Sequence, residues 1–257
     1  MSDNSNDDTF STDRVSQARS PFVTVAWGVA AIAMVLLAIA LLLPAVRTPR
    51  EASRRNDCLA HLRDLAIAIQ NYTDENGHLP PAYTVDAEGN RLHSWRTLLL
   101  PYMEEKPLYD KIDLTKPWDD PANAEAREQS IPPLMCASAP FEGEHLTSTT
   151  YLAVVGPDCA FSGSVPRTLA EIKDGTRTTM TVIDAPYSRA VHWMSPHDIS
   201  VEEVLALSPE SEFSHPGDFH AAFLDGHVKA LPQDIDRETL RGILTIAGGE
   251  EIEGVEF

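Results

Sequence analysis

Three histidines near the C-terminus, His215, His220 and His227, are the side chains best suited to chemistry. They fall within 13 residues, interleaved with Asp218 and Asp225. Imidazole and carboxylate groups are ligands that zinc and related divalent metals use. The spacing matches no zinc signature, and successive strand side chains point to opposite faces, so His220 and His227 need not converge. A structural role is favoured and no cofactor is expected, while His215, His220, His227 and Asp225 are the candidate metal ligands.

A second group of polar and aromatic residues comprises His192, Trp193 and His197. An indole beside two imidazoles can stack on a ligand, but a large aromatic ring more often packs in a core. We favour packing and keep binding as the alternative.

Motifs of nucleophilic and nucleotide chemistry are missing from the sequence. It contains no G-x-S-x-G elbow, no phosphate-binding P-loop and no dinucleotide fingerprint. The acidic pairs Asp119-Asp120 and Glu202-Glu203 are adjacent, so their carboxylates diverge rather than form an acid/base pair. We therefore expect a protein that is not an enzyme.

The three cysteines, Cys58, Cys136 and Cys159, leave at least one thiol unpaired within the chain. In an oxidising compartment two of them could form a disulfide. We prefer the pair Cys136–Cys159, because Cys58 falls near an apolar helical stripe, where a buried free thiol is equally compatible with the sequence.

The helix and strand signals around these residues predict an α+β fold, in which one long N-terminal helix packs on an antiparallel sheet. The dipeptide Asp225-Gly226 predicts a type I′ hairpin turn. Ser200 and Glu203 form a capping box for a short helix over residues 200–207. A C-terminal helix is expected over 236–247, ended by Gly248-Gly249. The predicted strands are residues 150–155, 179–183, 221–224 and 227–231.

The N-terminal part contains an uncharged apolar run over residues 22–43. As a helix it would be roughly 30 Å long, the thickness of a bilayer core, so it predicts a transmembrane helix. Residues 44–76 continue as a stalk helix, whose apolar positions recur at steps of three and four. These positions are Leu59, Leu62, Ala66, Ile69 and Tyr72.

The acidic residues are unevenly distributed along the chain. The formal net charge is −19, and most of it falls after residue 76, which argues against nucleic acid as a partner. We expect a disordered tail over 1–21, an α+β ectodomain over 77–247 and a loose tail over 248–257. More arginines follow the apolar run than precede it, and the positive-inside rule would then place the large domain in the cytoplasm.

Several long motifs follow one another in the chain, among them HSWRTLLLPYMEEKPLYDKIDLTKPWDDPAN from His93, PPLMCAS around Cys136 and HPGDFHAAFLDGHVKAL from His215. Together they resemble the bacterial pilin-like family known as domain of unknown function 1559. The resemblance covers roughly residues 40–232 in order. It implies a pilin-like, membrane-anchored protein whose ectodomain lies outside the cytoplasm, against the arginine count.

The family's prepilin signal is altered in this chain. Phe22 stands at the first mature position, but Pro21 replaces the glycine before the cleavage site and Ala26 replaces the glutamate used in assembly. We therefore expect no prepilin cleavage and a permanently anchored, single-pass protein.

Two functions remain open on the sequence. The first is a membrane-anchored, pilin-like envelope protein with a structural or interaction role, whose partners are the lipid bilayer and other envelope or pilin-like proteins. The second is an extracytoplasmic module that binds a carbohydrate or a metal. The second depends on the histidines and on Trp95, Trp118 and Trp193, taken as exposed.

Overall fold

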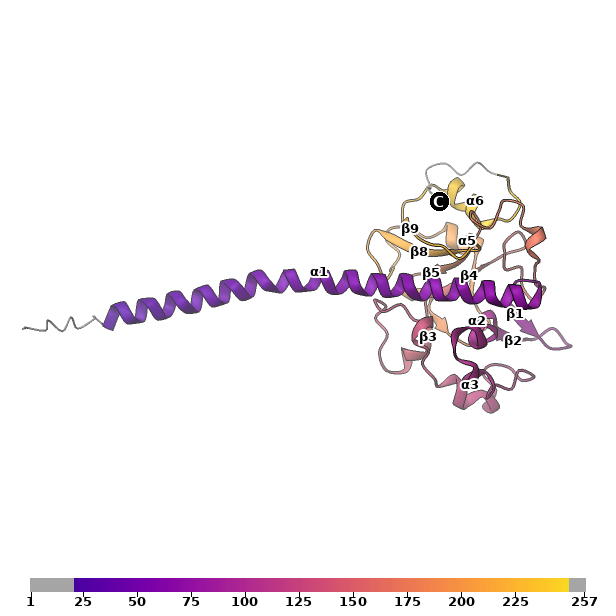
Figure 1. Cartoon of the computed structure of the whole chain (residues 1–257), viewed down its shortest axis with the longest axis horizontal. Helices are drawn as coiled ribbons and strands as arrows, with labels where there is room; N and C mark the ends of the chain where they lie inside the picture. The colour runs from indigo at the N-terminus through magenta and orange to yellow at the C-terminus, as the bar shows by residue number, and fades with distance from the viewer. Residues whose placement is uncertain (1–20, 250–257) are drawn as a thin grey trace, which may run out of the picture. The chain divides into compact units, whose positions relative to one another are not determined.

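The computed structural model describes the backbone of residues 21–249 and the side chains within that range, except 21–24, 40–50 and 144. The chain divides into two compact units, Met1–Arg50 and Glu51–Phe257. The longest element is helix α1 (Pro21–Asn76), drawn in indigo and violet in Figure 1. The predicted N-terminal tail, apart from Pro21, where α1 begins, and most of the predicted C-terminal tail lie outside the described residues.

The first unit contributes the N-terminal part of α1. Its described side chains, residues 25–39, are all exposed, and most are apolar; Trp27, for example, is 74% exposed. As far as side chains are described between residues 21 and 249, no helix combines the length and the apolarity needed to cross a membrane. The predicted span 22–43 includes side chains outside the described set and stays a prediction.

The second unit begins with the C-terminal part of α1, which has one buried face. The helix ends as predicted at Asn76, where Gly77 adopts a positive φ of 76° and its N–H bonds to the carbonyl of Thr73 at 2.8 Å. The predicted apolar stripe is confirmed in its centre, although Leu59 and Tyr72 are only partly buried. The buried apolar positions are Cys58, Leu62, Leu65, Ala66, Ala68 and Ile69.

A five-stranded sheet forms the centre of this unit. Four strands pair antiparallel as predicted, but the edge strand β7 pairs parallel to β4, so the expected wholly antiparallel sheet is wrong at that edge. In spatial order the strands are β7 (Ile199–Ser200), β4 (Tyr151–Val155), β5 (Met180–Asp184), β8 (Asp218–Phe223) and β9 (Val228–Pro232).

The sheet is covered on both faces, because its strand residues alternate between two apolar cores. Tyr151 and Ala153 join the core that contains α1, whereas Leu152 and Val154 join the other core. The second core includes side chains of α5 (Val201–Leu205) and α6 (Arg237–Leu244). The central strands β4, β5 and β8 are therefore buried along nearly their whole length rather than at alternate residues.

Short elements surround the sheet and complete the first core. Four short strands form two further pairs: β1 (Tyr83–Val85) with β2 (Arg91–Ser94), and β3 (Ser148–Thr149) with β6 (Val191–His192). The short helices are α2 (Trp95–Leu99), α3 (Lys106–Tyr109) and α4 (Ala124–Arg127). The 3₁₀ turns are η1 (Leu100–Met103), η2 (Pro121–Asn123), η3 (Pro132–Leu134), η4 (Gly143–Thr147), η5 (Leu169–Glu171) and η6 (Tyr187–Arg189).

One fully buried ion pair joins these elements to the sheet. The Arg96 guanidinium lies 2.7 Å from Asp198 Oδ1, and its Nε donates to the carbonyl of Tyr151 at 3.1 Å. The same Asp198 oxygen accepts from the indole of Trp95 and from the backbone N–H of Ala153. Because both charged side chains are buried, removing either one would leave the other charge without its counter-ion in the interior.

Helices α5 and α6 correspond to the two helices predicted over residues 200–207 and 236–247. The capping box of Ser200 and Glu203 at the start of α5 is confirmed. Helix α6 begins after the cap Asp236 but ends at Leu244, three residues before the predicted end. The chain leaves the helix because the carbonyl of Ile246 accepts hydrogen bonds from the backbone of Lys173 and Asp174.

The hairpin between β8 and β9 is confirmed, but its turn type is not. The N–H of Phe223 bonds to the carbonyl of His227, and the N–H of Gly226 bonds back to Phe223. Only Gly226 has a positive φ, 91°, whereas a type I′ turn needs positive φ at both central residues. The loop therefore has three residues and Gly226 in the left-handed position, as in a type I turn with a bulge.

We predict that Gly226→Val lowers the free energy of unfolding by about 1–3 kcal/mol, because valine is strained at this φ. A Cβ at this position would also lie 2.9 Å from Gln70 Oε1 on α1. Asp225→Asn should be nearly neutral, because asparagine can keep the bond from the N–H of His227 to Asp225 Oδ1. Urea unfolding of both variants checks this.

Gly226→Val in a Gln70→Ala background separates the backbone strain from the clash with Gln70. Removing the Gln70 side chain should relieve the clash and leave the strain. Gly89→Val is the matched control, because Gly89 has a similar φ of 88° and a Cβ there would meet no heavy atom within 4 Å. It should therefore report the backbone strain alone. An unchanged unfolding midpoint for Gly226→Val would contradict the described turn.

Candidate functional site

A small polar cluster interrupts the apolar core between α1 and the sheet. On β5 and β8, Ile183 lies opposite Ala221, and Asp184 and His220 are the next residues on these two antiparallel strands. Both belong to the face turned toward α1, because Val182 and Ala222, two residues away along their strands, pack in that core. Asp184 is 2% exposed and His220 is completely buried.

His215 joins this pair from the loop before β8. Its Nε2 lies 4.0 Å from Asp184 Oδ2, and its ring centroid lies 4.5 Å from that of His220. The same nitrogen is 3.4 Å from the sulfur of Cys136. Asp184, His215 and His220 therefore form one buried group, with one ligand atom of each within 4.8 Å of the others.

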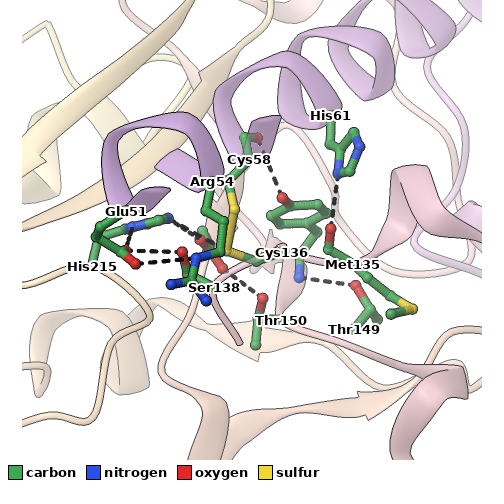
Figure 2. Close-up of a disulfide and its surroundings, with 12 residues drawn as sticks. Glu51, Arg54, Cys58, His61, Met135, Cys136, Ser138, Thr149, Thr150 and His215 are labelled. Atoms are coloured by element: carbon green, nitrogen blue, oxygen red, sulfur yellow. Dashed lines mark hydrogen bonds and ion pairs between the residues drawn. A yellow bond between two sulfur atoms is a disulfide. The ribbon is translucent and has the colours of Figure 1, made fainter. Parts of the chain in front are cut away.

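A disulfide between Cys58 and Cys136 borders the cluster, with a Cα–Cα distance of 4.9 Å (Figure 2). It links α1 to the segment that follows η3. The predicted pair Cys136–Cys159 is therefore wrong, because the buried face of α1 brings Cys58, rather than Cys159, to Cys136. Cys159 is a buried free thiol, and burial raises its pKa to about 12.

The surroundings of the disulfide hold α1 in a defined register. Tyr151 Oη donates to the carbonyl of Cys58 at 3.3 Å, and His61 Nδ1 lies 2.9 Å from the carbonyl of Met135. Figure 2 shows Glu51 and His215 together on one side of the disulfide and His61 with Met135 on the other. Residues from the helix, the sheet and two loops thus meet at this point.

Two further groups, Thr150 and Glu51, lie against the cluster. The Thr150 hydroxyl donates to Asp184 Oδ1 at 2.5 Å, which leaves Oδ2 on the side of His215. On α1, Glu51 Oε1 lies 3.5 Å from His215 Nδ1 and accepts a hydrogen bond from Ser138 at 3.0 Å. His215 therefore has a carboxylate on its Nδ1 side and another on its Nε2 side.

Burial dominates the ionisation of these groups. It raises the pKa of Asp184 to about 7, against the opposite effect of the Thr150 hydrogen bond. Burial, followed by the neighbouring His215 and Arg55, lowers the pKa of His220 to about 3. The pKa of His215 is also lowered, chiefly by burial. At neutral pH both imidazoles are therefore neutral, which is the form that binds metals.

His220 has an unusual environment for a buried polar side chain. Neither Nδ1 nor Nε2 has a hydrogen-bond partner among the described residues. A neutral imidazole carries one donor and one acceptor, whichever tautomer is present. Burying both without partners is unfavourable by about 1–3 kcal/mol for each group.

The other two sequence candidates, His227 and Asp225, lie elsewhere. They belong to the hairpin turn, where Asp225 Oδ1 interacts with the backbone N–H and with Nδ1 of His227. The His227 ring stacks on Phe223 with centroids 4.4 Å apart. The structure therefore brings together His215 and His220 of the four candidates and does not bring in His227 or Asp225.

Asp184, Glu51 and Thr150 are not among the site residues that the sequence predicts. Asp184 is the last residue of the apolar strand β5. Its position could have been noticed in the sequence, because a carboxylate at the end of a buried strand is rarely buried without a partner. Glu51 and Thr150 are ordinary polar residues in sequence, and only the packing of α1 and the strand register brings them to the cluster.

The second candidate group is a packing site. Trp193 is buried and its indole donates to the carbonyl of Gln129 at 2.9 Å. His192 Nε2 lies 3.0 Å from the carbonyl of Arg127, and its Nδ1 accepts from the N–H of Met194 at 3.1 Å. His197 is exposed and its Nδ1 lies 2.7 Å from the hydroxyl of Ser195.

Comparison with known protein families identifies the family of this chain. Residues 47–204 match the family described as "Protein of unknown function (DUF1559)", which is more than half of the chain. The chain belongs to this family. The matched region of this DUF1559 protein contains Glu51, both disulfide cysteines, Thr150 and Asp184, and it ends before His215 and His220. No curated protein and no solved structure matches the DUF1559 chain.

We predict that the double variant Cys58→Ala/Cys136→Ala lowers the free energy of unfolding by as much as about 4.5 kcal/mol, the loop-entropy value for a sequence separation of 78 residues. Urea unfolding measures the loss. Cys159→Ala is the control and should keep the disulfide.

Peptide mapping without reduction tests the pairing itself. The peptides of Cys58 and Cys136 should be joined, and Cys159 alone should alkylate after denaturation. A Cys136–Cys159 peptide would contradict the structure.

We predict that His192 makes stability pH-dependent between pH 6.5 and about 4. Burial lowers its pKa from 6.5 to about 4, so the unfolded chain binds the proton first and stability falls as the pH falls through this window. Protonation of Nδ1 would also remove the acceptor of the Met194 N–H. Unfolding free energies of the wild type and His192→Gln at pH 7 and about pH 4.5 should show a smaller loss in the variant.

His197→Gln provides the matched control, because His197 is an exposed histidine in the same segment of the chain. It should keep the wild-type pH dependence. Equal losses for the wild type and His192→Gln would contradict the assigned role.

Proposed function

We propose that this DUF1559 protein is a membrane-anchored, pilin-like envelope protein with a structural or interaction role and no enzymatic activity. The observation that carries the proposal is the uncovered apolar surface on α1. Between residues 25 and 39, Val25, Trp27, Ile32 and Met34 are each at least 63% exposed. An exposed apolar surface of this kind marks a site of contact with a membrane or a partner. The apolar sequence 22–43 is long enough to span the hydrocarbon core of a bilayer.

The disulfide supports a location outside the cytoplasm for the domain that starts at Glu51. Disulfides persist in oxidising compartments and are rare in the reducing cytosol. Cys58–Cys136 is buried and joins α1 to a distant loop, so it is part of the fold. This argument opposes the arginine count around the apolar run, and large following domains can override that count.

A pilin-like role further agrees with how α1 contributes to the domain. Its C-terminal part supplies one face of a core, and the same helix continues to the exposed apolar residues. The partners we propose are the lipid bilayer and other envelope or pilin-like proteins. Nucleic acid is disfavoured by the net charge of −19.

The carbohydrate-binding alternative loses most of its basis. It rested on exposed tryptophans, but Trp95 is 0% exposed and Trp193 is 1% exposed. Trp118 is partly buried and packs against His192, with ring centroids 5.0 Å apart. Trp95 and Trp193 are therefore not available to stack on a sugar, and Trp118 is only partly exposed.

We predict that the full chain fractionates with membranes and that protease added to spheroplasts removes the domain after residue 50. Deletion of residues 22–43 should release the protein into the soluble fraction, because the remaining chain is acidic and has no other long apolar run. Immunoblotting with an antibody to the domain follows both results.

A cytoplasmic marker protein serves as the control for spheroplast integrity. Full protection of the domain beside an equally protected marker would contradict the topology. Sequencing of the native N-terminus tests processing: a methylated Phe22 would contradict permanent anchoring and favour a processed pilus subunit.

A further inference from the structure

We propose that Asp184, His215 and His220 form a binding site for a divalent metal of the zinc type, buried between α1 and the sheet beside the Cys58–Cys136 disulfide. The site is independent of the proposed membrane anchor. Its ligands would be one carboxylate and two neutral imidazoles, a donor set that suits Zn²⁺ and neighbouring transition metals.

The distances agree with this assignment after a small closure. Zinc binds nitrogen and carboxylate oxygen at about 2.0–2.2 Å, so two tetrahedral ligands of one ion lie roughly 3.3 Å apart. His215 Nε2 and Asp184 Oδ2 are 4.0 Å apart, and the three ligand atoms lie within 4.8 Å of one another. Movements of about 1 Å or less in each side chain would bring them to the bond lengths of a common ion.

The outer contacts match those that orient metal ligands. A histidine ligand commonly places its second nitrogen against a carboxylate, and a carboxylate ligand is itself hydrogen-bonded. Glu51 lies on the Nδ1 side of His215, and Thr150 donates to the other oxygen of Asp184. The Thr150 bond leaves Oδ2 of Asp184 free on the side of His215 Nε2, while Glu51 approaches His215 Nδ1 at 3.5 Å without a hydrogen bond among the described residues.

The second, independent observation is the environment of His220. Its imidazole is completely buried, and neither ring nitrogen has a hydrogen-bond partner among the described residues. A bound cation would convert one of these nitrogens from an unsatisfied group into a ligand. Asp184 and His220 directly follow the paired residues Ile183 and Ala221 on neighbouring strands, so the sheet itself brings two of the three ligands close together.

The nearby charges are compatible with a cation. Asp184, Glu51 and Asp218 are acidic, whereas Arg54 and Arg55 are basic. Arg55 is paired with Asp218, and Arg54 Nε lies 3.4 Å from Glu51 Oε2 at the exposed side of the cluster. Asp184 is the one carboxylate of these three without an arginine partner in the described contacts, and it lies in the most buried position.

A second ligand set overlaps with this one and must be separated from it. Cys58, Cys136 and His215 also have ligand atoms within 4.8 Å of one another. A cysteine binds zinc as a thiolate, and the sulfurs of Cys58 and Cys136 are joined in a disulfide, so this set would require reduction of that disulfide. The oxidised chain offers Asp184, His215 and His220, and the proposal concerns that form.

The test uses the untagged full chain in detergent, with the disulfide verified by mass spectrometry. Calorimetric titration with Zn²⁺ should show one ion per chain, bound Co²⁺ should give visible absorption, and Zn²⁺ should raise the melting temperature. Asp184→Asn, which can keep the Thr150 hydrogen bond, should weaken Zn²⁺ binding at least about hundredfold. Glu51→Gln, at a partly exposed position, should weaken it about 10- to 100-fold.

His227→Gln is the matched control, since this histidine lies in the turn of the hairpin that carries His220 but outside the ligand set, and the variant should bind Zn²⁺ as the wild type does. Four results would overturn the proposal: no stoichiometric binding by the oxidised chain, binding only after reduction, wild-type affinity in Asp184→Asn, or equal weakening by His227→Gln. If Asp184→Asn does not fold, unchanged affinity in Glu51→Gln overturns it instead.

Discussion

Packing of one face of α1 against the central sheet is the constraint on which the domain depends. Arg55 pairs with Asp218 at the start of β8, and Gln70 lies against Gly226 just beyond its far end, so the helix follows the strand. Between these points the helix buries Cys58, Leu62, Leu65 and Ile69, each at 1% exposure or less. Burial on this scale stabilises a helix more than its intrinsic propensity does.

That packing also explains why a disulfide and a polar cluster share one place. The sheet turns Tyr151, Asp184 and His220 toward the helix because side chains alternate along each strand. The helix in turn brings Cys58 against the loop of Cys136. A cluster of two neutral imidazoles and one carboxyl within an apolar core is unfavourable unless its groups are satisfied. The arrangement is therefore more easily understood as a site than as a packing solution.

Membership of the DUF1559 family covers most of this architecture without adding a biochemical role. The matched region, residues 47–204, includes the helix face, the disulfide and three of the five sheet strands. It also includes Arg96 and Asp198, whose buried pair connects α2 to the edge of the sheet. The hairpin that carries His220 follows this region and completes both the sheet and the cluster.

Local patterns in the sequence determined the helix over 44–76, the capping box at Ser200, the hairpin at Asp225-Gly226 and the α+β class. Each depends on residues close together in the chain, so periodicity and turn chemistry suffice to predict it. Only the tertiary structure decided three other features: the disulfide partner of Cys136, the parallel pairing of the edge strand, and the proximity of Asp184 to His215 and His220. These contacts join residues far apart in sequence, and strand register and helix packing, which no local pattern encodes, determine which of them form.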